Sequence, residues 1–358
     1  MEVQRGVAAE PSGGQPTARP VDALALARHA GRLLRAPAPW LHVEVARRMA
    51  GRLRVLRSPP QRVVDWGAHG LAGAGAGAKT SEGAAPLREA CKHAHHTAAA
   101  LPPGWPRSDG AVPTAQDDVS TLPWWTWRRW SQAARPGLGG EPPIDERNLR
   151  EGQADLLWSN MVLHHLAEPQ TVFGRWRQLL AVDGILMFST LGPGTLETLR
   201  GAYRRAGWGP PHAPFVDMHD LGDMLVNAGF ADPVMDQEVI RLSWATAREA
   251  LAELRQLGGN AAPGRFAGLR TPRWRNALES TLQARRDAVP PRLAGAGAGQ
   301  ACDGAGLDAR VVLEFEVVYG HAVRPPARVR MAAESTLPLA ELRGMLRGPQ
   351  TGSNGPTR

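Results

Sequence analysis

The chain of 358 residues carries 42 Lys plus Arg against 34 Asp plus Glu, with a formal net charge of +8 and a pI near 10.7. This length fits one large α/β domain with additions or two domains, and 43% hydrophobic residues supply a core. Two cysteines exclude a disulfide framework and a four-thiolate metal site. No apolar leader segment and no run of about 18 apolar residues is present, so we expect a cytoplasmic protein without a membrane span.

The amino-terminal quarter begins with residues 1–20, which we expect to be a disordered lead. Residues 21–56 carry apolar side chains at helical spacing, and the "APAP" at 36–39 divides them into two predicted helices.

A short strand is predicted at "RVVDW" (62–66), with Gly67 directly after it. Such a glycine lets backbone approach a ligand closely, although His69 and Ala72 stand where a GxGxxG motif needs glycine. The "LAGAGAG" that follows recurs at 293–299, where no strand precedes it, so we interpret both copies as low-complexity sequence. Residues 71–115 are expected to be irregular.

Strands and helices alternate clearly from residue 154 onward. The pattern predicts strands at 154–160, 185–190, 234–244 and 311–323, a helix closing at Gly184, and helices over 194–207, 217–229 and 246–285, with Asp217 as an N-cap. Such alternation is typical of a doubly wound α/β domain, whose ligands bind where strands end. The last two strands are candidates for an antiparallel pair.

Several stretches leave their chemistry open when they are considered alone. "CKHAHH" (91–96) has no second ligand cluster, so we expect no metal site. "DDVSTLPWWTWRRW" (117–130) suits base stacking, a membrane interface or a packing flap, and we favour the flap. His164 and His165 in "SNMVLHH" follow a buried strand and are either acid–base residues or ordinary histidines. No GxSxG and no GxxxxGK[ST] occurs.

The segments "ADLLWSNMVLHH", "FSTLGPGTL", "VDMHDLGDMLVNAGFADPVMD" and "EVVYGHA" resemble class I S-adenosylmethionine-dependent methyltransferases. They resemble most closely the malonyl-acyl-carrier-protein O-methyltransferases of biotin synthesis, over roughly 155–322 and more weakly over 21–70. The resemblance implies a doubly wound, mostly parallel seven-stranded sheet with an antiparallel last strand. It also implies a helical cap at 21–56, a methyltransferase domain at 57–323 with a helical insertion (246–285) and a low-complexity loop (289–306), and a tail at 324–358.

The same resemblance implies S-adenosylmethionine as the cofactor and assigns candidate residues to it. "RVVDWGAHG" matches the first-strand motif at Asp65 and Gly67 only, with Gly70 as a partial substitute for a missing glycine. The expected donor contacts are Asp65, Gly67, Ala68, His69, Gly70, Glu82 (ribose), Asp118 (adenine), Ser159, Asn160 and Met161.

The implied reaction is methylation of the free carboxylate of a malonyl thioester, which is already ionised at pH 7 and needs no base. An arginine orients a carboxylate best, and the substrate-orienting candidates are Arg255, Asn260, Arg265, His164 and His165. The implied partner is an acidic acyl-carrier protein carrying malonyl, or malonyl-coenzyme A, which the Arg-rich helices would dock. We expect a monomer, no nucleic-acid partner and no metal.

Three alternatives stay open on the sequence. The chain is a methyltransferase for another small acid, a methyltransferase-like partner protein that has lost donor binding, or a nucleic-acid-binding module that uses "WWTWRRW".

Overall fold

The computed structural model describes residues 21–22, 25, 29, 38–56, 58–67, 83–100, 144–145, 148–166, 168–284, 286–288 and 309–327. The chain divides after Pro325 into two units, and every helix and strand below belongs to the first. Among the described residues, no helix combines the length and the apolar character that crossing a lipid bilayer requires.

One twisted sheet organises this unit, with strand order β3-β2-β1-β4-β5-β8-β6 and a short β7 paired beside β8. Neighbours from β3 to β5 are parallel, whereas β8 runs antiparallel to β5, β6 and β7. The doubly wound, mostly parallel sheet with an antiparallel last strand is therefore confirmed. The strands are β1 (Arg62–Trp66), β2 (His95–Ala100), β3 (Ile144–Asp145), β4 (Ala154–Ser159), β5 (Leu180–Leu191), β6 (Ala231–Trp244), β7 (Arg286–Ala288) and β8 (Ala309–Val323).

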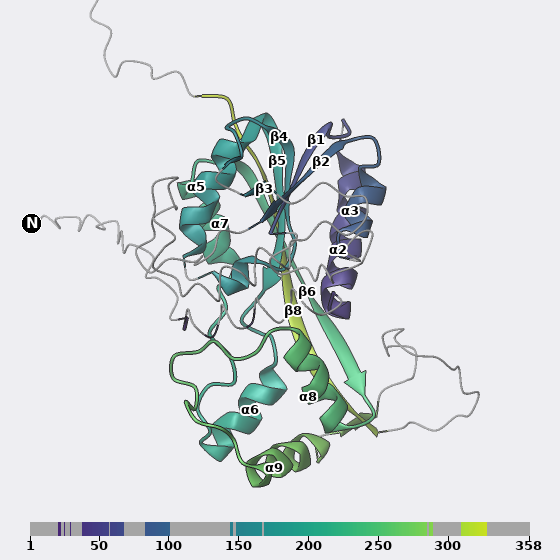
Figure 1. Cartoon of the computed structure of the whole chain (residues 1–358), viewed down its shortest axis with the longest axis vertical. Helices are drawn as coiled ribbons and strands as arrows, with labels where there is room; N and C mark the ends of the chain where they lie inside the picture. Colours follow the sequence, from purple (N-terminus) through teal and green to yellow (C-terminus); the bar gives the residue numbers. More distant parts are fainter. Residues whose placement is uncertain are drawn as a thin grey trace, which may run out of the picture. The chain divides into compact units, whose positions relative to one another are not determined.

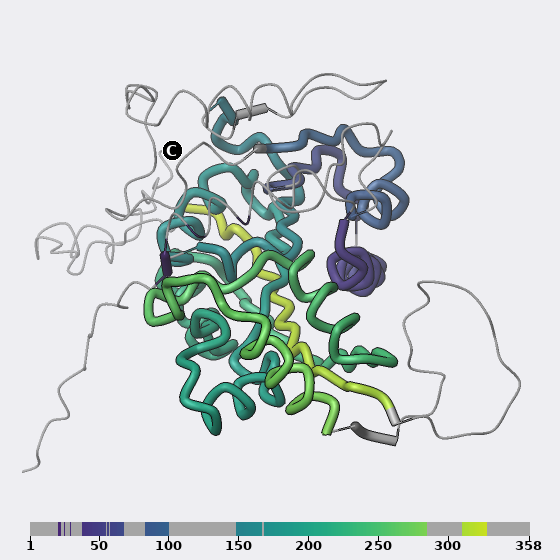
Figure 2. The backbone as a smooth tube through the Cα atoms, turned by 60° about the horizontal axis from the view of Figure 1, so that its bottom comes forward, coloured from purple at the N-terminus to yellow at the C-terminus, as the bar shows by residue number. Residues whose placement is uncertain are grey.

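Helices cover the two faces of the sheet and one end of its long strands (Figure 1). On one face lie α2 (Trp40–Arg52), which continues into η1 (Leu53–Val55), and α3 (Ala85–Ala90); on the other lie α5 (Pro169–Leu179) and α7 (Met218–Asn227). Figure 2 shows β8, in yellow, continuing toward the green helices α8 (Ala247–Gln256) and α9 (Pro272–Gln283), which together with α6 (Glu197–Ala206) contact it.

An aromatic cluster fixes α5 on its face of the sheet. Trp176 is fully buried, and its ring meets that of Trp66 edge-on with centroids 5.1 Å apart. Phe173 and Phe188 complete the cluster at centroid distances of 5.5 and 6.1 Å from Trp176. Such pairs contribute about 0.5–1.5 kcal/mol each beyond the burial of their area. This packing joins α5 to the last residue of β1 and to β5.

Helix boundaries follow local capping chemistry. The predicted N-cap Asp217 is confirmed, because its carboxylate accepts the backbone N–H of His219. Thr246 and Thr271 cap α8 and α9 in the same way. Gly229 takes φ +84° just after α7, a conformation that glycine adopts without strain.

The predicted boundary between α5 and β5 is wrong. Helix α5 ends at Leu179 rather than Gly184, because Leu180 already pairs with Ala154 and begins β5. A Cβ at Gly184 would lie 2.8 Å from the carbonyl oxygen of Ala181. Glycine is therefore needed here by the tight backbone in the first part of β5, and it does not end a helix.

Residues 71–115 are not irregular throughout, since α3 and β2 lie within them. Strand β2 reads "HHTAAA" and has few of the β-branched or aromatic residues that indicate a strand, so pairing with β1 determines it. The first of the two helices expected at 21–56 lies mostly outside the described residues, whereas α2 forms the second.

Candidate active site

A crevice is expected between β1 and β4, where the fold changes direction. The helix after β1 (α3) packs on one face of the sheet and the helix after β4 (α5) packs on the other. In open α/β sheets this switch point, at the carboxyl ends of the strands, is where nucleotide-like ligands bind. The residues that follow β1, β4 and β5 therefore define the candidate donor site.

Asp65 and Gly67 stand at the end of β1. Burial raises the pKa of the half-buried Asp65 carboxyl to about 7, and the nearby positive charge of Arg88 partly opposes that rise. Gly67 has φ +83°, its N–H donates to the carbonyl of Ala99 at 2.9 Å, and a Cβ there would lie 2.9 Å from Val162 Cγ2. Only glycine lets the two loops approach this closely.

Residues 159–161 form a hydrogen-bonded clasp at the end of β4. The Asn160 amide donates from Nδ2 to the carbonyl of His42 on α2 at 2.9 Å, and its Oδ1 accepts from Ser189 Oγ at 2.8 Å. Ser189 Oγ in turn accepts the N–H of Met161 at 3.0 Å, which holds that buried residue at φ +56°. We call Asn160, Ser189, Met161 and His42 the Asn160 clasp. It joins α2, β4 and β5 at the switch point.

The buried hydroxyl of Ser159 is available to bond a ligand. Its side chain is fully buried at the end of β4, and within the described residues Ser159 Oγ has no hydrogen-bond partner. A buried hydroxyl without a partner is costly, so a ligand group that bonds it would be favoured. Together with the glycine at the end of β1, this hydroxyl is compatible with a bound S-adenosylmethionine.

A cavity of about 250 Å³ opens beside these strand ends and extends between α6, α8 and α9. Its lining is mostly apolar, which suits a ligand that brings carbon chain as well as a polar end. The lining residues are Val21, His164, His165, Leu191, Leu196, Leu199, Tyr203, Pro211, His212, Ala213, Phe215, Leu251, Leu254, Arg255, Leu257, Gly259, Asn260, Ala261, Trp274, Arg275, Leu278 and Phe315.

The two candidate histidines lie together in the wall of this cavity, on η4 (Leu163–His165). The rings of His164 and His165 are 4.1 Å apart, and His164 meets Phe215 edge-on at 6.1 Å. The hydroxyl of Thr190 lies 3.5 Å from His164 Nδ1, which connects this wall to the end of β5.

The three candidates from the 255–265 stretch have different surroundings. Arg255 lines the cavity, and among the described residues its guanidinium makes no hydrogen bond or ion pair. Asn260 also lines the cavity, but its amide donates to the carbonyl of Pro210 at 2.7 Å and accepts from a backbone N–H, so it holds its own loop. Arg265 pairs with Asp22 at 2.6 Å and is not part of the lining.

The remaining candidates lie outside the described residues: Ala68, His69, Gly70, Glu82 and Asp118, along with "WWTWRRW". Glu82 was predicted to bind the ribose, and in the chain it comes before α3 and so before β2. It therefore does not follow the carboxyl end of β2, the strand beside β1. The end of β2 that pairs beside Asp65 and Trp66 carries alanines. Among the described residues, no group of three His, Cys, Asp or Glu side chains could hold a metal ion.

Sequence reasoning missed the residues that support the site from outside. The loop of "LGPGTL" is held on β8, because Gly192 N–H and Thr195 Oγ1 donate to the carbonyl of Glu316 at 2.9 and 3.1 Å. A Cβ at Gly192 or Gly194 would collide with the Glu316 carboxylate, at 2.1 or 2.5 Å. This contact explains both glycines and fixes the cavity wall at Leu191 and Leu196. The sequence indicates these two glycines only as part of the "LGPGTL" motif. The residue that explains them, Glu316 on β8, lies about 120 residues further along the chain.

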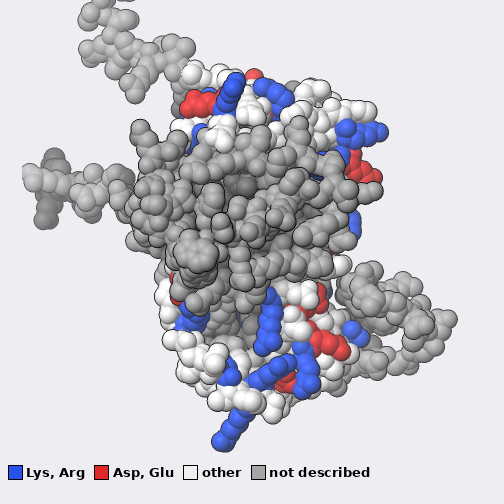
Figure 3. Space-filling model, in the orientation of Figure 1, with Lys and Arg blue, Asp and Glu red and all other residues white. Residues whose placement is uncertain are grey.

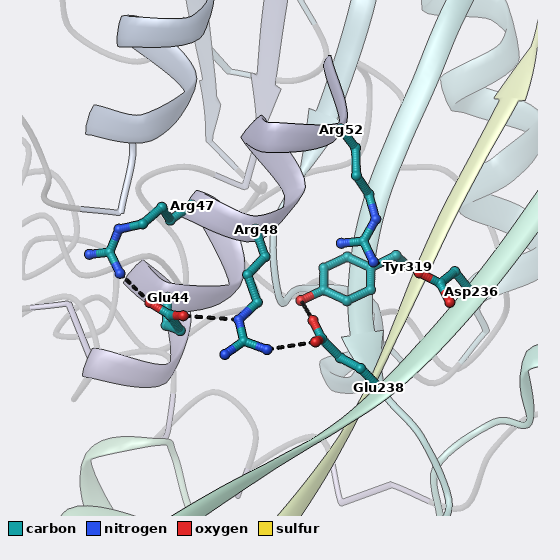
Figure 4. A network of polar contacts seen from close by, with 7 residues as sticks. All are labelled: Glu44, Arg47, Arg48, Arg52, Asp236, Glu238 and Tyr319. Atoms are coloured by element: carbon teal, nitrogen blue, oxygen red, sulfur yellow. Dashed lines mark hydrogen bonds and ion pairs between the residues drawn. The ribbon is translucent and has the colours of Figure 1, made fainter. Parts of the chain in front are cut away.

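A polar network fastens α2 to the antiparallel pair of strands β6 and β8 (Figure 4). Arg48 bonds Glu44 on its own helix at 2.9 Å and Glu238 on β6 at 2.6 Å. Tyr319 on β8 donates its O–H to Glu238 at 2.6 Å, and the guanidinium of Arg52 lies 3.7 Å above the Tyr319 ring. Burial, with the Glu238 carboxylate, raises the pKa of Tyr319. The Asn160 clasp thus attaches to a helix that is itself fixed.

The chain is similar in sequence to known methyltransferases. A family model for a methyltransferase domain matches residues 141–188. The malonyl-[acyl-carrier protein] O-methyltransferase of Laribacter hongkongensis is 34% identical over 291 residues, which cover 81% of this chain and 84% of the relative. The corresponding protein of Gallionella capsiferriformans is 32% identical over 294 residues, covering 81% and 86%. The solved YcgJ protein of Bacillus subtilis aligns with a TM-score of 0.40 at 9% identity, over 78% of this chain and 99% of that one.

Proposed function

The chain belongs to the malonyl-[acyl-carrier protein] O-methyltransferase family, and we propose that it methylates the free carboxylate of malonyl held as a thioester on an acyl-carrier protein. The ester would enter early biotin synthesis, the role that the resemblance implies. The observation that supports this most strongly is the cavity beside the strand ends, which combines an apolar lining with one guanidinium that has no partner within the described residues.

S-adenosylmethionine is the methyl donor of the family, and when bound it supplies a sulfonium methyl group. The residues proposed to hold it are Asp65, Gly67 and Ser159, with Met161 positioned beside them by the Asn160 clasp. Asn160 itself is proposed as a positioning residue, because both ends of its amide are already bonded to protein.

The reaction requires alignment more than proton transfer. A carboxylate with an ordinary pKa near 4 is ionised at pH 7, so its oxygen is nucleophilic without a base. The protein has to bring that oxygen in line with the methyl carbon and exclude water. We propose that Arg255 binds the carboxylate and that the apolar side chains of α6, α8 and α9 exclude water around it.

Substitution of Arg255 tests this assignment. Hydrogen bonds to a charged group contribute about 1.5–3 kcal/mol, so Arg255→Ala should lower kcat/KM for malonyl-carrier protein by about 10- to 150-fold, with donor binding unchanged. Arg255→Lys should recover part of the loss. Arg54→Ala, at an exposed arginine of η1, is the matched control. An Arg255→Ala enzyme with normal kcat/KM would remove Arg255 from the site.

The choice of thioester remains part of the proposal. Malonyl-carrier protein and malonyl-coenzyme A present the same reacting group, so turnover of both should be compared at equal concentration. A clear preference for the carrier-bound form supports contacts beyond the cavity. Equal kcat/KM values would favour malonyl-coenzyme A as a sufficient substrate.

A further inference from the structure

The part of the molecule around α6, α8 and α9 has an unbalanced positive charge. Residues 197–210 and 247–284 contain nine arginines, no lysine and four acidic residues. Figure 3 shows basic side chains gathered over this part of the surface, in the lower part of the view. Within the described residues, the exposed guanidinium groups of Arg205 and Arg273 form no ion pair or hydrogen bond. By contrast, Arg48 and Arg52 on α2 are each paired with an acidic residue.

Two large apolar side chains are exposed in the same part of the molecule. Leu269 is 97% exposed and Phe266 is 53% exposed, both in the loop between α8 and α9. A single exposed leucine is ordinary, but exposed apolar groups within a ring of charge are typical of a protein interface. We call Arg205, Phe266, Leu269, Arg270 and Arg273 the α6–α9 face.

The loop that carries these side chains is fixed in place. Arg270 lies 4.2 Å from the ring centre of Phe266 and 4.7 Å from that of Trp274, and it donates to the carbonyl of Trp208 at 2.8 Å. The rings of Trp208 and Trp274 pack edge-on at 5.6 Å. A preorganised surface loses less entropy on binding than one that must become ordered.

This face also borders the cavity. Trp274, which supports Arg270, lines the cavity, as do Asn260 at the start of the loop and Arg275 on α9. A macromolecule seated on the loop would therefore lie beside residues that line the cavity, within reach of a group carried on a flexible arm.

We propose that the α6–α9 face docks the acidic surface of the acyl-carrier domain that presents the thioester, with Leu269 and Phe266 at the centre and Arg205 and Arg273 at the rim. This inference rests on the proposed function. Charge complementarity selects the partner, because rim arginines steer an acidic protein and hold its orientation. The apolar centre favours a protein over nucleic acid, whose backbone would leave Leu269 unburied.

Steady-state kinetics with two substrates tests the proposal. Malonyl-loaded acyl-carrier protein needs the face, whereas malonyl-pantetheine has the same reacting group and no carrier domain. The double variant Arg205→Glu/Arg273→Glu and the single variant Leu269→Ser should each raise KM for the carrier substrate about tenfold or more. Both should leave kcat, KM for malonyl-pantetheine and the unfolding midpoint unchanged. The matched controls, Arg54→Glu on η1 and Val226→Ser on α7, should resemble the wild type.

The outcomes separate the docking surface from the reaction. If the wild type methylates both substrates and the face variants keep a normal KM for the carrier, the docking proposal is overturned and the proposed function stands. If the wild type methylates neither thioester, the proposed function fails and the docking proposal fails with it. Competition by duplex DNA as strong as competition by unloaded carrier protein would also overturn the choice of partner.

Discussion

Replacing Asn160 by alanine distinguishes a positioning role from a direct donor contact. The change removes the bond from Nδ2 to the His42 carbonyl and the acceptor of Ser189 Oγ, both inside the protein. Each lost buried hydrogen bond costs about 1–3 kcal/mol where its partner is left unsatisfied. The helix carbonyl of His42 retains an intrahelical partner, so we expect a total loss of about 2–4 kcal/mol in the free energy of unfolding.

Ser189→Ala provides the graded comparison. It also breaks the clasp, but the N–H of Met161 still donates to the Ser189 carbonyl at 3.1 Å and the His42 bond survives. We therefore expect a loss of about 1–2 kcal/mol, smaller than for Asn160→Ala. Urea denaturation without ligand measures both values, and calorimetric titration with S-adenosylmethionine measures donor affinity. An Asn160→Ala protein of wild-type stability that binds the donor poorly would refute the clasp and make Asn160 a donor ligand.

Three further changes test the surroundings of the site. Because burial raises the pKa of Asp65 from 3.8 to about 7, the folded protein holds that proton more tightly than the unfolded chain, and stability should fall as pH rises from about 4 to about 7. Denaturation at pH 5 and pH 8 should show a fall of about 2–3 kcal/mol in the wild type, and Asp65→Asn should remove it; equal falls in both proteins would contradict the buried carboxyl. Gly320→Ala should cost about 1–3 kcal/mol, since its Cβ would lie 2.3 Å from Phe188, and an unchanged unfolding midpoint would disprove the close packing. Tyr319→Phe should cost about 1–2 kcal/mol in the free energy of unfolding, because it removes the donor to Glu238. If the change has no effect in either the wild type or an Arg48→Ala background, the network does not stabilise the fold.

The parts of the fold with strong local signals could be predicted from the sequence. The apolar run that became β5 and the Asp217 cap of α7 depend on residues close together in the chain. Strand β2 could not be predicted, because its alanines and histidines carry no strand signal and the pairing partner β1 lies about 30 residues away. The entry to β5 was assigned to a helix because the helical period of α5 continues through Leu180.

The candidate site shows the same division. The stretch after β4 and the arginine-rich insertion were predicted to carry site residues, and the structure places His164, His165, Arg255 and Asn260 in the lining of one cavity. The pairing of Arg265 with Asp22 and the bonding of Asn160 to α2 are long-range contacts that no local pattern indicates. The glycines of "LGPGTL" were recognised only as a motif, since their physical reason is a carboxylate on β8.

The proposed reaction is tested most directly by transfer of a labelled methyl group from S-adenosylmethionine to malonyl-carrier protein, followed by mass analysis of the thioester. We expect one added methyl per carrier, on the free carboxylate of malonyl, and no labelling of a carrier that bears an acetyl group instead. Donor binding without transfer to malonyl-carrier protein, or a label on any other group, would contradict the proposed reaction.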